Sequence, residues 1–374
     1  ITNNSGDYTI YLAHSSNNSI EQNILINNEA NPIICLEGSS YNIFANNVLS
    51  VDPSFQGIYI AGSDYNMIVG NKITNASGTA IWIYGGSSGN QIYGNTIKNN
   101  AKGIVIWGAS NNIIFHNNFI NNSQQVSLSS GCINVWDDGY PSGGNYWSDY
   151  VGVDVKSGPS QDLPGSDGIG DTPYTIDTNN TDNYPLMQPY YGPVRNLNTG
   201  QSYPTIQEAI NDASEGDTVF VLSGIYGELV VLNKTLRLIG ESQLVTIIDG
   251  WVDVKANNVV LSGFAIGGFT AFIRGMTMCH GIRLSGANCV VSNNTVFNTG
   301  TGIWLLNSTD NAMNNNVLIA NAYNVYLSES SNNTISQNYI KSMEWKGGIL
   351  FMNYGIELDR SSNNTIIQNN ITQC

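Results

Sequence analysis

One polar and apolar phrase recurs along this chain at regular intervals. It reads SSNNSIEQNIL at 15–25, SSNNTISQNYI at 330–340 and SSNNTIIQNNI at 361–371. Equivalent positions lie 21 to 25 residues apart, except for one step of 31, where residues 344–352 interrupt the pattern. Short alternating strands at this period, without helical periodicity, are typical of a β-solenoid in which each repeat forms one coil.

Each repeat contains two short phrases. One has the form apolar-x-apolar, as in GIYI at 57–60 and GIWL at 302–305. The other is apolar-x-x-Asn, and its asparagines are Asn23, Asn46, Asn71, Asn95, Asn117, Asn294, Asn316, Asn338 and Asn369. Asparagine tolerates a left-handed backbone, and stacked amides can hydrogen-bond between coils about 4.8 Å apart. We therefore expect these asparagines to form the turns and to bond along the solenoid axis.

The repeat stops near residue 130 and returns near residue 255, which divides the chain into three segments. We predict β-helix coils over 1–130, an irregular Gly-, Asp- and aromatic-rich cap and linker over 131–192, and a second β-helix over 193–374. The last segment is expected to start with a capping helix at about 203–213. Such covers are needed because an open solenoid end exposes strand edges and apolar core. Both chain ends fall inside coils, so we expect either an excerpt of a longer tandem protein or end-to-end stacking of copies.

Three stretches carry a family resemblance. PTIQEAINDASEGDTVFVLSGIYGE at 204–228 resembles the opening segment of the NosD-like repeat units of exported archaeal surface proteins, whereas GNYWSDY at 144–150 and DGIGDTPYTID at 167–177 resemble the closing segment. The whole chain resembles the pectin-lyase-like superfamily. The resemblance implies an all-β, right-handed parallel β-helix and an extracellular, cell-surface location. It selects no activity, because that superfamily hosts lyases, hydrolases, adhesins and wall proteins.

Composition narrows the classes of partner. The formal charge is −15, and charged residues make up only 11% of the chain. Nucleic acid is therefore not expected as a partner, since phosphate binding needs clustered cations. No run of 18 apolar residues occurs, so no membrane span is expected in this segment. The cysteines form no CxxC motif, and Cys35 and Cys374 are the candidates for a disulfide or a crosslink between chains.

Catalytic chemistry has few candidates here. β-Helix enzymes that cleave acidic polysaccharides need clustered carboxylates beside Arg or Lys. The candidates are scattered over different coils: Asp310, Glu329, Glu357, Asp359, Arg360, His280 and Arg283. Without paired carboxylates on one strand, we do not expect an enzyme.

No cofactor is expected to be required. Asp167 and Asp171, with Asp154 or Asp162, could form a Ca²⁺ loop, or these residues could only cap turns. The resemblance to NosD suggests copper. Three scattered histidines, His14, His116 and His280, instead favour ordinary surface or turn residues.

A column of outward residues alternates with the inward aliphatic ones. It reads Tyr11, Cys35, Tyr59, Trp82 and Val105, then Arg283, Trp304, Tyr326 and Glu357. Its aromatic members, Tyr11, Tyr59, Trp82, Trp304 and Tyr326, are expected to form a flat stacking strip. This strip could bind glycan rings or a neighbouring chain, or it could reflect only the preference of aromatic residues for strands.

The chain also contains eleven N-x-Ser/Thr sequons, which are compatible with secretion and N-glycosylation. Their asparagines are Asn3, Asn17, Asn75, Asn121, Asn179, Asn233, Asn293, Asn307, Asn332, Asn363 and Asn370.

These features favour a non-catalytic structural protein of an extracellular layer, sheath or filament. Its expected partners are copies of itself and cell-surface glycans. The alternatives are a carbohydrate-binding or carbohydrate-cleaving β-helix, and an adhesion module of a larger surface protein.

Overall fold

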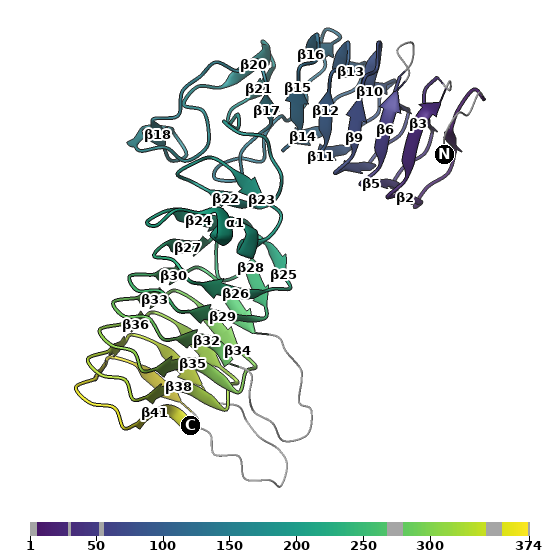
Figure 1. The fold of residues 1–374 in the computed structure, drawn as a ribbon. Helices are drawn as coiled ribbons and strands as arrows, with labels where there is room; N and C mark the ends of the chain where they lie inside the picture. Colours follow the sequence, from purple (N-terminus) through teal and green to yellow (C-terminus); the bar gives the residue numbers. More distant parts are fainter. Residues whose placement is uncertain (1–5, 29–30, 52–55, 268–279, 342–353, 373–374) are drawn as a thin grey trace. The chain divides into compact units, whose positions relative to one another are not determined.

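The computed structural model describes residues 6–28, 31–51, 56–267, 280–341 and 354–372. The chain forms two compact units, unit 1 (Ile1–Tyr191) and unit 2 (Gly192–Cys374). Each unit is a right-handed parallel β-helix whose coils stack through parallel strand ladders, as the sequence predicts (Figure 1). In the part of the chain that the structure describes, no helix is long and apolar enough to span a membrane.

Three parallel sheets run along unit 1. The first, the long-strand sheet of unit 1, contains β1 (Ile10–Ala13), β4 (Ile34–Glu37), β7 (Ile58–Ala61), β10 (Thr79–Tyr84), β13 (Lys102–Trp107) and β16 (Gln124–Leu128). The second contains β2 (Ser19–Glu21), β5 (Ile43–Ala45), β8 (Met67–Val69), β11 (Gln91–Tyr93) and β14 (Ile113–Phe115). The third contains β3 (Ile24–Asn28), β6 (Val48–Val51), β9 (Lys72–Thr74), β12 (Thr96–Lys98), β15 (Asn118–Ile120) and β17 (Tyr146–Trp147).

An irregular cap closes the last coil of unit 1. It contains two antiparallel hairpins, β18 (Lys156–Ser157) with β19 (Leu163–Pro164) and β20 (Tyr174–Asp177) with β21 (Asn180–Asp182). The buried ring of Trp147 stacks on Phe119 of the last coil and on Tyr174 of the cap, with both centroid distances 4.3 Å. The cap thus continues the apolar core and shields it from water.

Unit 2 opens with its own cover. Strand β22 (Val194–Asn196) runs antiparallel to β23 (Ser202–Tyr203) and to the first coil strand. Helix α1 (Ile206–Asp212) follows, slightly shorter than the predicted range. The side chain of Thr205 caps it by accepting from the backbone N–H of Glu208, and its buried face packs into the core.

Three parallel sheets then follow in unit 2. The first contains β24 (Thr218–Val221), β27 (Arg237–Gly240), β30 (Val260–Ser262), β33 (Val290–Ser292), β36 (Ala312–Asn314), β39 (Thr334–Ser336) and β42 (Thr365–Ile367). The second contains β25 (Gly224–Tyr226), β28 (Thr246–Asp249), β31 (Ala265–Gly267), β34 (Thr295–Phe297), β37 (Val317–Ile319), β40 (Tyr339–Lys341) and β43 (Asn370–Thr372). The third, the long-strand sheet of unit 2, contains β26 (Leu229–Leu232), β29 (Trp251–Val254), β32 (His280–Leu284), β35 (Thr301–Leu306), β38 (Tyr323–Ser328) and β41 (Tyr354–Asp359).

The asparagines form a continuous column inside each unit. In unit 1 the side-chain amide of each one donates to the Oδ1 of the next at 2.9 to 3.0 Å, along Asn23, Asn47, Asn71, Asn95, Asn117 and Asn145. In unit 2 the same bonds, at 2.9 to 3.2 Å, join Asn294, Asn316, Asn338 and Asn369. Each Oδ1 also accepts the backbone N–H of the coil before it, so buried amides are paired.

Two details of the expected column are wrong. Asn46 does not belong to it, because Phe44 rather than Ile43 pairs with Ile20, which places Asn47 in the column. The column members also do not adopt the left-handed backbone themselves. The residue before each one does, as at Asn46 with φ 54° and Asn293 with φ 55°, except before Asn145 at the end of the unit 1 column. One residue bends the chain and the next one bonds along the axis.

Further polar columns had not been expected from the sequence. A second one in unit 1 joins Asn18, Asn42, Asn66, Asn90, Asn112 and Asn134. Its counterpart in unit 2 joins Asn311, Asn333 and Asn364. These residues lie at the corner after the long-strand sheet, and each stands two positions before an apolar residue. This recurring Asn-x-apolar spacing was the signal that could have revealed them.

Candidate functional sites

The long-strand sheet of unit 2 presents an aromatic and charged surface, the unit 2 face. Its middle outward column pairs Asp253, Arg283, Trp304, Tyr326 and Glu357 in register on five successive strands. The aliphatic residues on either side of this column are buried on β29, β32, β35 and β38, whereas on the last strand, β41, Ile356 is half-buried and Leu358 is exposed. The period-2 alternation of a strand therefore sets polar and aromatic side chains side by side on the surface.

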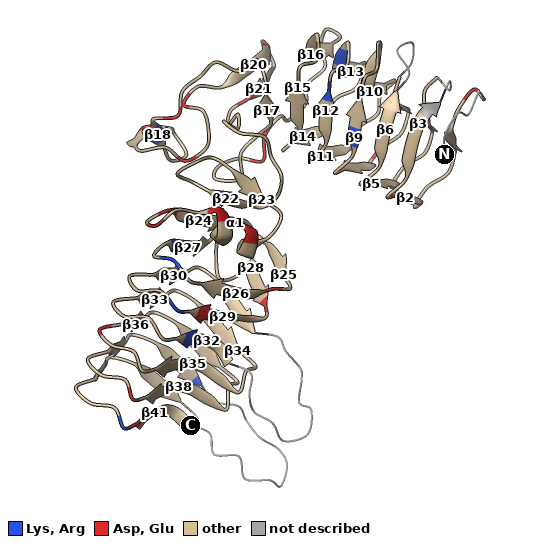
Figure 2. Cartoon of the chain, in the orientation of Figure 1, with Lys and Arg blue, Asp and Glu red and all other residues tan. Residues whose placement is uncertain are grey.

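One carboxylate of this face holds two basic side chains. Asp253 Oδ1 lies 2.9 Å from Nε2 of His280, and its Oδ2 lies 2.5 Å from Nη2 of Arg283. Acidic β29 lies beside basic β32 in Figure 2, on a surface with few other charges. The sequence singled out His280 and Arg283 but missed Asp253. The alignment of WVDV at 251–254 with GIRL at 281–284 was the signal for it.

Aromatic rings continue this cluster across the next coils. The His280 ring meets Trp304 edge-on at 6.2 Å, Trp304 stacks on Tyr326 at 6.2 Å, and Tyr323 stacks on Tyr354 at 5.2 Å. The Trp304 Nε1 donor and the Glu357 Oε2 acceptor are buried, and neither has a hydrogen-bond partner among the described residues. The face thus combines an aromatic platform with a fixed charge cluster.

The other expected catalytic candidates do not join this cluster. Arg360 pairs with Glu329 at 2.7 Å and with Asp359 at 3.3 Å, and all three side chains are well exposed. Asp310 accepts a hydrogen bond from the neighbouring Thr309. Exposed pairs of this kind contribute little to stability or to chemistry.

The long-strand sheet of unit 1 presents the unit 1 face, which is aromatic but almost uncharged. Trp82 meets Tyr59 and Trp107 at 5.4 Å each, with interplanar angles of 75° and 83°. The expected flat stacking strip is therefore wrong for unit 1, because the rings interlock edge-to-face. Tyr84 and Trp107, which the sequence analysis missed, lie in a second outward column and are 46% and 41% exposed. Tyr11 lies on the same sheet and donates to Glu37 at 2.6 Å.

The cysteines differ from the expected crosslinks. Cys35 is a free thiol and only 1% exposed, although it belongs to the outward column. Burial raises the pKa of its thiol to about 12, with a further rise from nearby Glu37. A buried thiol of this kind is a poor crosslinking group. Cys132 and Cys289 are also buried and free, whereas Cys279 and Cys374 lie outside the described residues.

Asp167 and Asp171, the two carboxylates suggested for a Ca²⁺ loop, accept hydrogen bonds from backbone N–H groups of the cap. Asp167 accepts from the backbone of Gly158 and Ile169, and Asp171 accepts from the backbone of Val155 and Lys156. These carboxylates fasten separate loops to one another. Within the described ranges, no three His, Cys, Asp or Glu side chains converge to hold a metal ion.

The histidines of the described residues do not come together as a set of copper ligands. His14 is an exposed turn residue, and His116 stacks on Tyr190 with its Nε2 2.9 Å from the carbonyl of Ser142. His280 is held by Asp253. The described residues therefore do not fit a copper centre.

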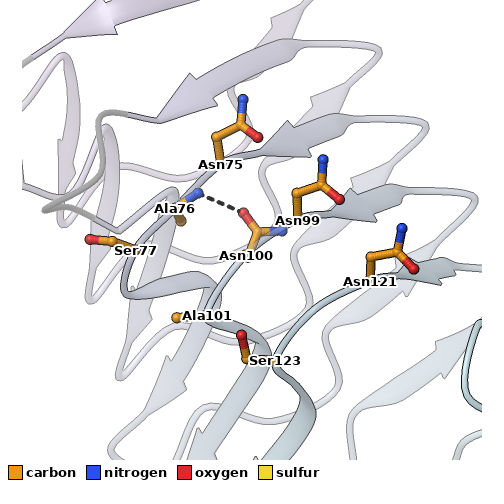
Figure 3. Close-up of a pocket in the computed structure, with 8 residues that line it drawn as sticks. All are labelled: Asn75, Ala76, Ser77, Asn99, Asn100, Ala101, Asn121 and Ser123. Atoms are coloured by element: carbon orange, nitrogen blue, oxygen red, sulfur yellow. Dashed lines mark hydrogen bonds between the residues drawn. The ribbon is translucent and has the colours of Figure 1, made fainter.

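A shallow groove of about 440 Å³ follows one corner of unit 1. Three asparagines from successive coils, Asn75, Asn99 and Asn121, project their side chains in parallel along it (Figure 3). Ser77 and Ser123 line the same groove. Beneath them, the buried Oδ1 of Asn100 accepts from Ala76 N at 2.9 Å, which belongs to a third amide column.

One curated relative is similar to part of this chain. A cell surface glycoprotein of Methanothermus fervidus is 34% identical over 117 residues, which cover 30% of this chain and 18% of that protein. The chain therefore spans under a fifth of the length of the curated relative that it matches.

Among solved structures, two epimerases overlap with most of the chain. The periplasmic alginate epimerase AlgG shares 11% identity, with 94% of this chain and 73% of that chain covered and a TM-score of 0.20. The A-module of the Azotobacter vinelandii mannuronan C-5 epimerase AlgE4 shares 10% identity, with 97% and 74% covered and a TM-score of 0.21. At these TM-scores the overlap has no bearing on the activity of this chain.

The profile of a protein family matches both units. It covers residues 1–152 and 210–374 and carries the description periplasmic copper-binding protein (NosD). The match includes the coils of both units and leaves out most of the cap. The chain therefore belongs to the NosD family.

Proposed function

We propose that this chain is a non-catalytic structural part of an extracellular surface layer, in which β-helix units pack side by side. The matched relative is named as a cell surface glycoprotein, and the family description is periplasmic; both support a location outside the cytoplasm. The matched segment is a minor part of that relative, so the role of the whole protein belongs to the proposal as well.

The unit 1 face carries this proposal. It offers a contiguous row of aromatic rings, of which Tyr84 and Trp107 are nearly half exposed, on a sheet with few charges. Contiguous exposed aromatic surface of this kind marks protein–protein contacts, because covering it releases ordered water without desolvating charges. A second copy of the same flat sheet is the occupant that we propose.

Electron microscopy and sedimentation velocity of the native protein test this role. Wild-type protein should form arrays or larger species, and the double variant Tyr84→Ser, Trp107→Ser should sediment as the smaller species. A matched control is Tyr41→Ser, Tyr65→Ser, because these rings also stack, at 5.3 Å, and are each 57% exposed, but lie at a corner of two other coils of unit 1. Dispersed wild-type monomers at all concentrations would contradict the proposal, as would equal losses in both double variants.

A second candidate function is carbohydrate binding at the unit 2 face. The Trp304–Tyr326 platform lies next to the Asp253 cluster, where the Arg283 side chain is 32% exposed and can donate to a sugar hydroxyl. Sugar rings combine apolar faces with hydroxyl rims, and sites with an aromatic surface and a few fixed polar groups suit them. The paired Asp253 and Arg283 charges offset each other, which favours a neutral sugar.

Titration with neutral oligosaccharides, followed by tryptophan fluorescence, separates the two candidates. Trp304→Ala and Arg283→Met should abolish binding at the unit 2 face, whereas Trp82→Ala in unit 1 should leave the affinity unchanged. Fluorescence that stays constant for every neutral oligosaccharide on a broad array would rule out this second candidate and leave the structural role in place.

A further inference from the structure

The sequon asparagines share one structural property. All ten that fall within the described ranges have exposed side chains: Asn17, Asn75, Asn121, Asn179, Asn233, Asn293, Asn307, Asn332, Asn363 and Asn370. Asn3 lies outside those ranges. Most other asparagines of the coils are buried in the columns. Exposure therefore separates the sequon asparagines from most of the column asparagines.

The coil corner accounts for most of these sequons. In Asn293-Asn294-Thr295, the first residue is left-handed and exposed, the second is buried in the column, and the third begins a strand. The same arrangement occurs at Asn332 and Asn363. Seven of the ten described sequon asparagines have this left-handed backbone at a corner, which displays the side chain outward: Asn17, Asn75, Asn121, Asn293, Asn307, Asn332 and Asn363.

The groove of unit 1 provides three matched positions. Asn75, Asn99 and Asn121 occupy the same corner with φ values of 64°, 58° and 51°, and all three are exposed. Their side-chain amides have no hydrogen-bond partner among the residues that the structure describes, and they point outward together (Figure 3). The sequence alone distinguishes them. Asn75 and Asn121 precede Ser77 and Ser123 by two residues, whereas Asn99 precedes Ala101.

We propose that Asn75 and Asn121 carry N-linked glycans that line this corner of unit 1, with Asn99 unmodified between them. The donor is an oligosaccharide linked to a lipid phosphate. The Nδ2 atom of asparagine forms a bond to the anomeric carbon as the bond from that carbon to the phosphate oxygen breaks. The amide loses one proton to the transferase, and the lipid phosphate leaves with the electron pair. The serine hydroxyl two residues later is the recognition element of the sequon.

The groove suits such a modification. Its volume of about 440 Å³ gives the first sugar rings room beside the small side chains of Ala76 and Ala101. The corner is also separate from the strands that form the unit 1 face, so the glycans leave the packing surface free. The inference rests on the extracellular location in the proposed function, because the transferase acts on exported chains.

Glycopeptide mass spectrometry of the exported protein, from a host that performs N-glycosylation, tests this directly. Peptides with Asn75 and Asn121 should carry glycan mass, and the peptide with Asn99 should not. Ala101→Ser completes a sequon at Asn99, with serine at the position that Ser77 and Ser123 occupy in the flanking coils. This variant should gain one glycan, at Asn99. Asn75→Gln should remove one glycan and leave Asn121 occupied.

A co-expressed protein with an occupied sequon serves as the control for transferase activity. If that control is glycosylated while Asn75 and Asn121 stay bare in exported protein, the proposal is overturned. Glycan on Asn99 of the wild type would also contradict it. Cell fractionation keeps the two proposals apart, because unglycosylated protein at the cell surface leaves the structural role intact, whereas retention in the cytoplasm counts against the proposed location.

Discussion

The indole Nε1 of Trp147 lies 2.8 Å from Oδ2 of Asp182, where the asparagine column of unit 1 ends. The backbone N–H of Asn145, the last asparagine of the column, donates to the same oxygen at 2.7 Å. The N–H of Tyr184 donates to Oδ1 at 3.1 Å. Asp182 thus replaces the next asparagine that another coil would have supplied. Asn180 ends the second column in the same way, by accepting from Asn134 N at 2.9 Å.

Removal of the Asp182 carboxylate should destabilise unit 1. Asp182→Ala leaves three buried N–H donors unpaired, and each costs about 1–3 kcal/mol, so we expect a loss of at least about 3 kcal/mol in the free energy of unfolding. Urea denaturation of the variant measures this. Asp162→Ala in the exposed part of the cap is the control and should change stability by less than about 0.5 kcal/mol. A similar small effect at Asp182 would show that water replaces the carboxylate.

Stability should also depend on the protonation of Asp182. Burial raises the pKa of this carboxyl from its ordinary value of 3.8 to about 7, against the opposing effect of its N–H donors. Between those two pH values the folded protein holds the proton more often than the unfolded chain. The free energy of unfolding should therefore fall as the pH rises from about 4 to about 7, by an amount on the order of 4 kcal/mol.

Asp182→Asn isolates this effect from all other titrating groups, since it keeps an acceptor oxygen and removes the proton equilibrium. The decline in stability between about pH 4 and pH 7 should be shallower in this variant. Parallel pH profiles for the wild type and the variant would show that Asp182 has an ordinary pKa in the folded protein.

The adjacent residues Asn46 and Asn47 should respond very differently to substitution. Asn47→Ala leaves the backbone N–H of Asn23 without a partner and removes the side-chain bond to the carbonyl of Ile20, so we expect a loss of about 2–3 kcal/mol. Asn46→Gly should change the stability by less than about 1 kcal/mol, because glycine adopts the left-handed backbone at φ 54° without strain. Thermal denaturation compares the two variants. The opposite order would mean that Asn46 belongs to the column after all.

Native protein should resist alkylation at Cys35. The thiol is buried under the unit 1 face, and its pKa of about 12 leaves almost no thiolate at pH 8. Iodoacetamide followed by peptide mapping should leave Cys35 unmodified in the folded protein and modify it fully in denaturant. Rapid modification without denaturant would show that the side chains over the thiol move aside in solution.

Much of the fold could be predicted because each coil repeats a local pattern. The phrase at 15–25 and its copies predict the strands, the inward aliphatic column and the presence of axial amide bonds. The cap over 131–192 was predicted from its composition, but the way it closes the core was not. Asp182 reaches the last coil through a hairpin with no repeat pattern, so no local signal points to it.

The period, the solenoid class and the outward position of residues such as Trp82 and Trp304 follow from local sequence, because strand alternation and turn chemistry act over a few neighbouring residues. Contacts between coils settle which asparagine of the pair at 46–47 enters the column, that Cys35 is buried, and that Asp253 pairs with both His280 and Arg283. These features depend on the register between coils, and one coil of variable length shifts every pairing that follows. Side-chain packing across coils then sets burial and charge pairing, which no single repeat contains.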